Sequence, residues 1–312
     1  MEKTTSKRNV SSADSFPIFI ADLMSNKTPL NRDCRGARTD TACNAGKGND
    51  MTKPEFIPKL REIQSFVIPQ IKQALGPLFF ATSLEKKKGN VIDNGSFAYV
   101  GTHKKNLLVT CHHVWNGFLE ERAKKPGLRL CACFDDRTPV PFCTLPDGTE
   151  NKPIDQDKQL DIATFDMKPF EHYVRDKNFF FPNHFPQSIV NQNDAVAIIG
   201  CPGKQRIDLG HAVGWGRQPY IGFVSEISGF KIKVDFTRMM SLNREMTINP
   251  KDEKPATSGT SGCPCFVFRA DYKPYLIGFV TEQHIQFRNE VQITCANCIS
   301  EDGTLKSPMS FC

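Results

Sequence analysis

The spacing of apolar residues changes twice along the chain, near residues 55 and 76. Residues 1–54 are rich in Ser, Thr, Asn, Asp, Lys and Arg and show no sustained period, which predicts a mobile or partner-dependent leader. Over residues 55–75 apolar side chains recur at helical spacing, which predicts one amphipathic helix. These apolar positions are Phe56, Leu60, Ile63, Val67, Ile71 and Leu75.

Beyond this helix the chain consists of short apolar runs separated by Gly, Pro, Asn and Asp. The runs are rich in Val, Ile, Phe, Leu and Thr, as β-strands are. They lie at 96–100, 106–110, 128–134, 161–165, 195–200, 221–227, 231–236, 265–269, 274–281 and 291–295. Such a series predicts an all-β sandwich or barrel. We interpret the proline-containing loop at 179–187 as the joint between two barrels.

Composition excludes several classes of protein. The chain has 312 residues, of which 39% are hydrophobic and 24% charged, so neither wholesale disorder nor a fibrous repeat describes it. No apolar stretch approaches the roughly 20 residues that a membrane helix needs, and the N-terminus lacks the apolar core of a secretory signal. We therefore predict a cytoplasmic protein whose twelve cysteines are reduced thiols.

The charge distribution gives little support for a nucleic-acid partner. The net charge of +6 is mild, and the leader carries nine Lys or Arg against six Asp or Glu without a pattern. Nucleic-acid binding needs a clustered basic face. We expect a solvated leader and no nucleic-acid partner.

Three short segments carry residues suited to acyl transfer. They are 107–114 (LLVTCHHV), 160–165 (LDIATF) and 258–265 (SGTSGCPC). Acyl transfer needs a hydroxyl activated by an imidazole, a carboxylate that orients the imidazole, and backbone N–H groups aimed at the oxyanion. Each segment alone also fits a surface histidine pair, a turn aspartate or a flexible loop. Their order, with gaps of 48 and 100 residues in an all-β chain, favours the chemical interpretation.

Together these segments resemble the chymotrypsin-like serine peptidases, especially their HtrA-like branch. The resemblance implies that His113 is the general base, with His112 as its neighbour, and that Asp161 is the orienting carboxylate. It implies Ser261 as the nucleophile, because GTSGCP is similar to the family's Gly-x-Ser-Gly-Gly-Pro. The oxyanion hole would consist of the N–H groups of Gly259 and Ser261.

The resemblance extends over roughly residues 76–298 and implies an architecture. Segments 196–203, 222–227 and 276–281 agree with the HtrA-like version. We expect two antiparallel six-stranded β-barrels at 76–180 and 181–298, with the active site between them and a C-terminal tail at 299–312. We expect no second, peptide-binding domain and therefore no regulation through such a domain.

The same resemblance places the substrate-binding residues. The strand at 276–281 would border the specificity cleft, and the Thr281 hydroxyl would donate to Asp161. The base of the primary pocket would lie near Pro255 and Ala256, where no carboxylate occurs, which favours an uncharged P1 residue. Acidic residues lie close to this pocket in sequence, so a preference for a basic P1 residue stays an alternative. The full predicted substrate-binding set is Pro255, Ala256, Thr281, Glu282 and Gln283.

Three positions depart from the family pattern. Cys263 replaces a glycine of the serine motif, and Val114 stands where secreted relatives place a cysteine, so the usual disulfide cannot form. Thr260 precedes the nucleophile, where trypsin-like zymogens have an aspartate that pairs with a new N-terminal ammonium. Because a hydroxyl cannot neutralise a buried ammonium, we expect an oxyanion loop that is ordered constitutively or by a ligand or partner.

The predicted function is that of a serine endopeptidase without a cofactor, acting on protein or peptide substrates, in quality control or as an effector regulated by a protein partner. One alternative is a trypsin-fold binding or scaffold module without catalysis. Another is structural zinc at Cys295 and Cys298, which have half of a zinc-ribbon spacing. The close pairs Cys131–Cys133 and Cys263–Cys265 instead fit small buried hydrophobic residues in strands.

Overall fold

The computed structural model describes most of the chain from residue 68 onward. The described ranges are 68–82, 91–134, 139–174, 179–180, 190–201, 206–208, 213–215, 218–236, 259–268, 273–284 and 290–306. The predicted leader and most of the helix predicted at 55–75 lie outside these ranges. The first described elements are a short α-helix, α2 (Ile68–Ile71), and a 3₁₀ turn, η4 (Lys72–Ala74).

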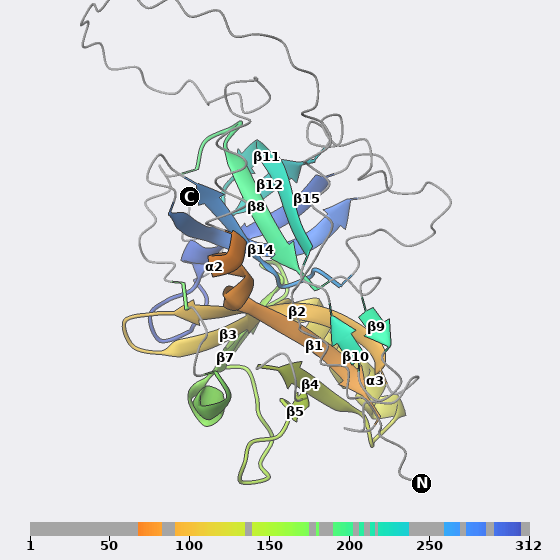
Figure 1. Cartoon of the computed structure of the whole chain (residues 1–312). Helices are drawn as coiled ribbons and strands as arrows, with labels where there is room; N and C mark the ends of the chain where they lie inside the picture. Colours follow the sequence, from red (N-terminus) through yellow and green to blue (C-terminus); the bar gives the residue numbers. More distant parts are fainter. Residues whose placement is uncertain are drawn as a thin grey trace, which may run out of the picture.

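The first half of the fold is an antiparallel sheet of seven strands in the order β5-β4-β1-β2-β3-β7-β6 (Figure 1). The strands are β1 (Leu75–Ala81), β2 (Val91–Gly101), β3 (Asn106–Thr110), β4 (Arg129–Cys133), β5 (Pro139–Pro141), β6 (Asp155–Asp157) and β7 (Ile162–Asp166). Helix α3 (His112–Lys124) connects β3 to β4, and a 3₁₀ helix, η5 (Lys168–Tyr173), follows β7. The sheet has one strand more than the six predicted, because the three-residue strand β6 pairs with β7 at the edge.

The second half is a closed antiparallel barrel of six strands, in the order β11-β12-β15-β14-β13-β8. Its strands are β8 (Ala195–Gly200), β11 (Gln218–Ser228), β12 (Lys231–Asp235), β13 (Pro264–Phe268), β14 (Pro274–His284) and β15 (Glu290–Cys295). A separate hairpin pairs β9 (Arg206–Asp208) with β10 (Val213–Trp215), and η10 (Ala296–Cys298) follows β15. The predicted all-β architecture is confirmed.

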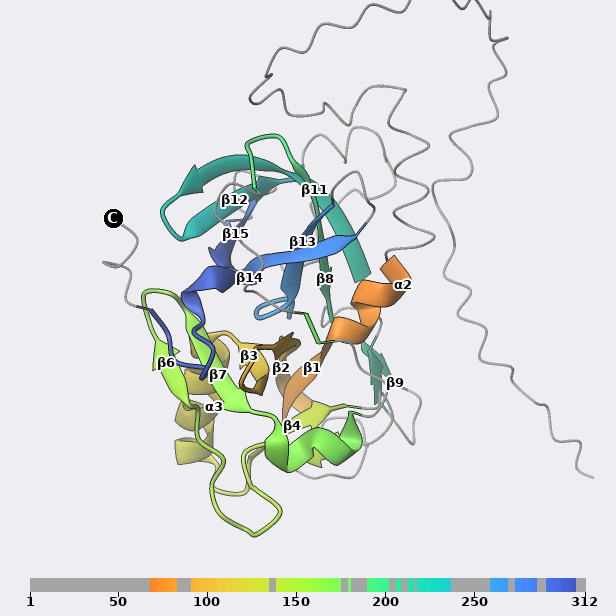
Figure 2. The ribbon, with the colours of Figure 1, turned by 90° about the vertical axis from the view of Figure 1, so that its left-hand side faces the viewer.

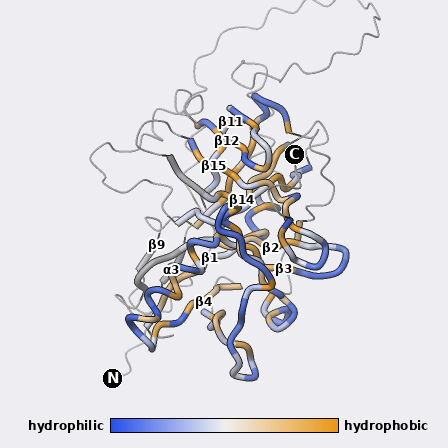
Figure 3. The backbone as a smooth tube through the Cα atoms, turned by 180° about the vertical axis from the view of Figure 1, so that it is seen from behind, coloured by the Kyte–Doolittle hydropathy of each residue, from blue (hydrophilic) through white to orange (hydrophobic). Residues whose placement is uncertain are grey.

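A shared hydrophobic core joins the sheet to the barrel, so the site between them has a fixed frame. One cluster combines residues of α2 and β1, such as Ile71 and Leu75, with barrel residues such as Ala197, Phe266 and Phe279, all at most 1% exposed. A second cluster, rich in aromatic side chains, fills the sheet beneath α3. Figure 3 shows hydrophobic positions concentrated in the strands and hydrophilic positions in the connections between them.

Residues 299–306 return from the barrel to the sheet. Ile299 and Leu305 form an isolated β-bridge, and the Leu305 N–H donates to the Asp155 carboxylate at 2.8 Å. The Thr164 hydroxyl of β7 donates to the Gly303 carbonyl at 2.6 Å. Figure 2 shows this dark blue segment beside β6 and β7. This part of the predicted C-terminal tail therefore packs on the first sheet.

Two further features bear on the sequence expectations. Within the described ranges, no helix has both the length and the apolar character that crossing a membrane requires. Nine cysteines lie in these ranges and all are free thiols, eight of them buried.

Candidate active site

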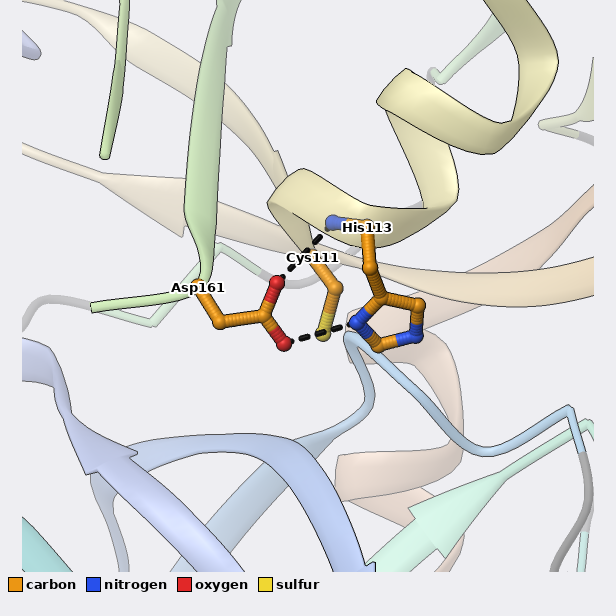
Figure 4. A group of neighbouring side chains, drawn as sticks. All are labelled: Cys111, His113 and Asp161. Carbon is orange, nitrogen blue, oxygen red and sulfur yellow. Dashed lines mark hydrogen bonds and ion pairs between the residues drawn. The ribbon is translucent and has the colours of Figure 1, made fainter. Parts of the chain in front are cut away.

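His113 and Asp161 meet at the start of helix α3. The Asp161 carboxylate accepts two hydrogen bonds from His113: the backbone N–H donates to Oδ1 at 2.9 Å, and ring Nδ1 lies 2.7 Å from Oδ2 (Figure 4). The cap residue, Cys111, makes no side-chain capping bond, so the carboxylate satisfies one of the N–H groups that a helix leaves open at its start. One side chain thus both caps the helix and orients the imidazole.

The hydrogen bond at Nδ1 determines where His113 can act. A carboxylate accepts only, so the neutral imidazole carries its proton on Nδ1 and keeps a lone pair on Nε2. The His113 side chain is 50% exposed and that of Asp161 19% exposed. The imidazole is therefore anchored on one side and accessible to a substrate on the other.

The backbone at Asp161 is held in an unusual conformation. Its φ of 57° lies in the left-handed region, which costs a non-glycine residue roughly 1–2 kcal/mol. The preceding carbonyl, that of Leu160, accepts from Thr294 Oγ1 at 2.6 Å and from Lys231 Nζ at 3.2 Å. Lys231 Nζ also donates to Thr294 Oγ1 at 2.7 Å. Two barrel strands, β12 and β15, thus fix the peptide that positions the carboxylate.

The loop before β13 presents Ser261 between two glycines in the left-handed region. The φ angles are 93° at Gly259 and 85° at Gly262. Ser96, fully buried in β2, holds this loop from the opposite side: its hydroxyl donates to the Gly259 carbonyl at 2.9 Å and its N–H to the Ser261 carbonyl at 2.8 Å. The Ser96 hydroxyl also accepts from the Cys201 N–H at 3.2 Å.

The Ser261 loop lies against the strand end that leads into His113. A Cβ on Gly262 would come within 2.3 Å of the Ser96 carbonyl oxygen and 2.8 Å of Thr110 Oγ1. Thr110 is the last residue of β3, three positions before His113. Within the described part of the chain, no hydrogen bond joins Ser261 to His113. Hydrogen bonds of catalytic groups are often long before substrate binds.

The N–H groups predicted for the oxyanion hole, those of Gly259 and Ser261, donate to no other described residue. The Thr260 carbonyl accepts from the Cys263 N–H at 2.9 Å. In a trans peptide the carbonyl and the N–H of the same unit point in opposite directions, so the Ser261 N–H points away from Cys263. This N–H remains available to a ligand.

Thr260, the residue before Ser261, is buried. Its side chain is 2% exposed, and a Cβ on Gly200 would come within 2.5 Å of Thr260 Cγ2. The loop is therefore packed on β8 through a methyl group.

The predicted substrate-binding residues are only partly described. Pro255 and Ala256 lie outside the described residues. Glu282 and Gln283 belong to β14, where they pair with Gln292 and Val291 of β15.

The contact predicted for Thr281 is wrong. The Thr281 hydroxyl is 3.2 Å from Thr294 Oγ1 and donates to the Gln292 carbonyl at 3.4 Å, and no hydrogen bond joins it to Asp161 among the described residues. The Thr294 hydroxyl of the adjacent strand contacts Thr281 and donates to the Leu160 carbonyl, so Thr294 and not Thr281 supports the peptide before Asp161.

Sequence reasoning missed the residues that support the site from a distance. Ser96 lies 163 residues from Gly259, and Thr294 lies 134 residues from Leu160, so no local pattern reveals these pairs. The available signal was a polar residue within an apolar strand, as at Ser96 in SFAYV. Such residues, once buried, need hydrogen-bond partners.

Cys111 lies directly beside the His113–Asp161 pair. Its thiol is fully buried and donates to the Val280 carbonyl at 3.1 Å. Burial raises the pKa of this thiol well above its ordinary value, and the Asp161 charge raises it further, so the thiol is neutral. His112 lies between Cys111 and His113 in the sequence. Its Nδ1 is buried and has no hydrogen-bond partner among the described residues.

Comparisons with known proteins give matches of fold only. No protein-family model matches the chain, and no curated protein matches it. The solved serine endoprotease from Yersinia pestis matches with a TM-score of 0.42 and 14% identity, over 74% of this chain and 61% of that chain. Deg5 matches with a TM-score of 0.45 and 16% identity, over 76% and 90%. The match thus spans less than two thirds of the Yersinia protein.

Proposed function

We propose that this protein is a serine endopeptidase of trypsin-like fold. Ser261 Oγ attacks the peptide carbonyl carbon while its proton passes to Nε2 of His113, and the N–H groups of Gly259 and Ser261 bind the oxyanion. His113 then gives the proton to the leaving amine, which leaves an acyl-enzyme. Water, deprotonated by His113, releases the carboxylate product and restores Ser261.

The observation that carries this proposal is the double hydrogen bond from His113 to Asp161. A surface histidine gains no function from a fixed tautomer, whereas a general base needs its free lone pair on Nε2. The same carboxylate stabilises the imidazolium that forms when the serine proton is taken up. The packing of the Ser261 loop on Thr110, three positions before His113, supports Ser261 as the nucleophile.

The test is reaction with a fluorophosphonate probe together with hydrolysis of a mixed peptide library. We expect labelling at Ser261 and its loss in Ser261→Ala and His113→Ala, with turnover reduced by several orders of magnitude. His112→Ala is the matched control, because it removes an adjacent imidazole that forms no hydrogen bond with Asp161 among the described residues. Equal losses in His112→Ala and His113→Ala, or no labelling of the intact chain, would favour a binding module without catalysis.

The finer proposals concern substrate, control and compartment. We expect an uncharged P1 residue, and strong selection for Arg or Lys in the library would overturn this. Control comes from a protein partner or ligand that acts on the oxyanion loop or through the leader, and not from a new N-terminus, because Thr260 offers no carboxylate. The nine cysteines among the described residues are all free thiols, which supports a reducing, cytoplasmic compartment.

A further inference from the structure

Three potential metal ligands of different chemistry converge at the start of α3. The Sγ of Cys111, a ring nitrogen of His113 and a carboxylate oxygen of Asp161 lie within 4.8 Å of one another (Figure 4). In the described part of the chain, no other group of three such side chains comes this close together. The peptidase reaction uses His113 and Asp161 and leaves the thiol unexplained.

We propose that Cys111, His113 and Asp161 form a site for Zn²⁺ that inhibits the peptidase. Binding of the cation stands on this geometry alone, whereas its effect on turnover rests on the proposed function. Zinc lies about 2.3 Å from sulfur and about 2.0–2.2 Å from nitrogen and carboxylate oxygen. Tetrahedral coordination therefore separates the ligand atoms by about 3.3–3.7 Å. The Nδ1–Oδ2 distance of 2.7 Å must open by about half an ångström to admit the ion.

The surroundings of the three side chains suit a thiophilic divalent cation. Coordination replaces the hydrogen bond from Cys111 to Val280, and the thiol proton passes to bulk water. The thiolate and the carboxylate then balance the two positive charges, so the partly buried site carries no net charge. His113 is half exposed, which leaves a side open for a water molecule as fourth ligand. Magnesium and calcium prefer oxygen ligands and should not compete.

Coordination at Nδ1 removes the properties that His113 needs as a base. The metal takes the Nδ1 lone pair, so the neutral ring must carry its proton on Nε2. Nε2 then has no lone pair to accept the Ser261 proton. The Asp161 carboxylate binds the metal and no longer orients the imidazole.

The test uses the full chain, freed of metal by a chelator, and Co²⁺ as the spectroscopic probe. We expect one equivalent of Co²⁺ to give a thiolate-to-cobalt charge-transfer band, which one equivalent of Zn²⁺ removes. Cys111→Ala and Cys111→Ser should both lose the band. Both variants should also need a higher Zn²⁺ concentration for half-inhibition than the unchanged chain. Inhibition is measured for each protein as a fraction of its own rate without metal. Loss of a residue that only contacts a metal ligand lowers metal affinity by about 10- to 100-fold. Because Cys111 is proposed as a ligand itself, the half-inhibition concentration should rise by more than this.

Cys295→Ala is the matched control, because Cys295 and Cys298 offer the competing thiol pair. The band should survive in Cys295→Ala. Loss of the band there and its retention in both folded Cys111 variants would overturn the proposal. So would the absence of a band in the intact chain, even if that chain hydrolyses peptides. A band that depends on Cys111 in a chain without peptidase activity would keep the metal site and reject only the proposed function.

Discussion

The Asp161 carboxylate accepts two hydrogen bonds from one residue, His113 of helix α3. Oδ1 holds the backbone of His113, and Oδ2 holds its imidazole. The first bond fixes where the helix begins, and the second fixes the ring that the helix carries. An amide in the same place would keep the first interaction and change the second, which allows the two roles to be separated.

Asp161→Asn should therefore leave the fold intact and abolish most of the activity. The amide oxygen can still accept the His113 N–H, whereas the amide NH₂ favours the wrong imidazole tautomer. We expect kcat to fall by about 10⁴-fold with little change in the melting temperature. Steady-state kinetics and circular dichroism check this result. A loss below about tenfold would contradict the assigned role of the carboxylate.

Gly262→Ala tests the close approach of the Ser261 loop to β2. Its φ of 85° and the 2.3 Å distance between a new Cβ and the Ser96 carbonyl oxygen leave no room for a side chain. We expect the free energy of unfolding to fall by about 2 kcal/mol or more, with loss of fluorophosphonate labelling. Gly127→Ala is the control, since a Cβ there meets no atom within 4 Å. Equal stability of the two variants in denaturant titrations would contradict the described packing.

Among the elements, strands β12 and β15 of the barrel hold the turn before β7 of the sheet by hydrogen bonds. Lys231 and Thr294 both donate to the Leu160 carbonyl, and Thr294 is completely buried. These bonds cross from one half of the molecule to the other. The left-handed conformation of Asp161 thus depends on residues of the other half of the molecule.

Thr294→Val should lower kcat without an equal change in KM. Valine has the shape of threonine but leaves the Leu160 carbonyl and the Lys231 ammonium short of a partner, which allows the Asp161 peptide to relax. We expect kcat to fall by about tenfold, the equivalent of about 1.4 kcal/mol. Thr294→Ser keeps the hydroxyl and should restore the rate. Failure of Ser to restore it would assign Thr294 to packing alone.

The sequence predicted the strands and candidate site residues, but it did not predict the residues that hold the candidate site in place. The short apolar runs separated by Gly, Pro, Asn and Asp predicted the barrel strands, because buried strands are rich in apolar residues and end at turn residues. The family resemblance pointed to His113 and Asp161, which the structure brings together, whereas the role of Ser261 stays a prediction. Ser96, Lys231 and Thr294 were not predictable, because their partners are set by how the two halves pack. Thr281 was assigned the wrong partner for the same reason.

For the whole molecule, buried thiols make stability sensitive to alkaline pH. Burial raises the pKa of Cys131 and Cys298 to about 12 and that of Cys295 to about 11. A thiol whose pKa is higher in the folded state stabilises the fold below its unfolded pKa of about 8.5. It loses that contribution as the pH rises toward the folded value.

The melting temperature should thus fall steadily above about pH 8.5. Each of these thiols should contribute about 1–2 kcal/mol of the loss by about pH 10. Thermal unfolding between about pH 7 and pH 10.5, followed by circular dichroism in the presence of reductant, measures the decline. Cys298→Ala should show a shallower decline than the unchanged chain. A melting temperature that stays constant over this range would contradict the assigned burial.

The return of residues 299–306 to the first sheet sets an order for biosynthesis. Gly303 contacts Thr164 across 139 positions, and Leu305 contacts Asp155 across 150. Contacts between residues so far apart in sequence form late. On the ribosome, the edge strand β6 therefore stays uncovered until residues 299–306 have been translated after the barrel strands. The nascent chain must avoid pairing with other polypeptides during that interval. Completion of the first sheet therefore waits until the barrel strands, and Ser261 before them, have been translated.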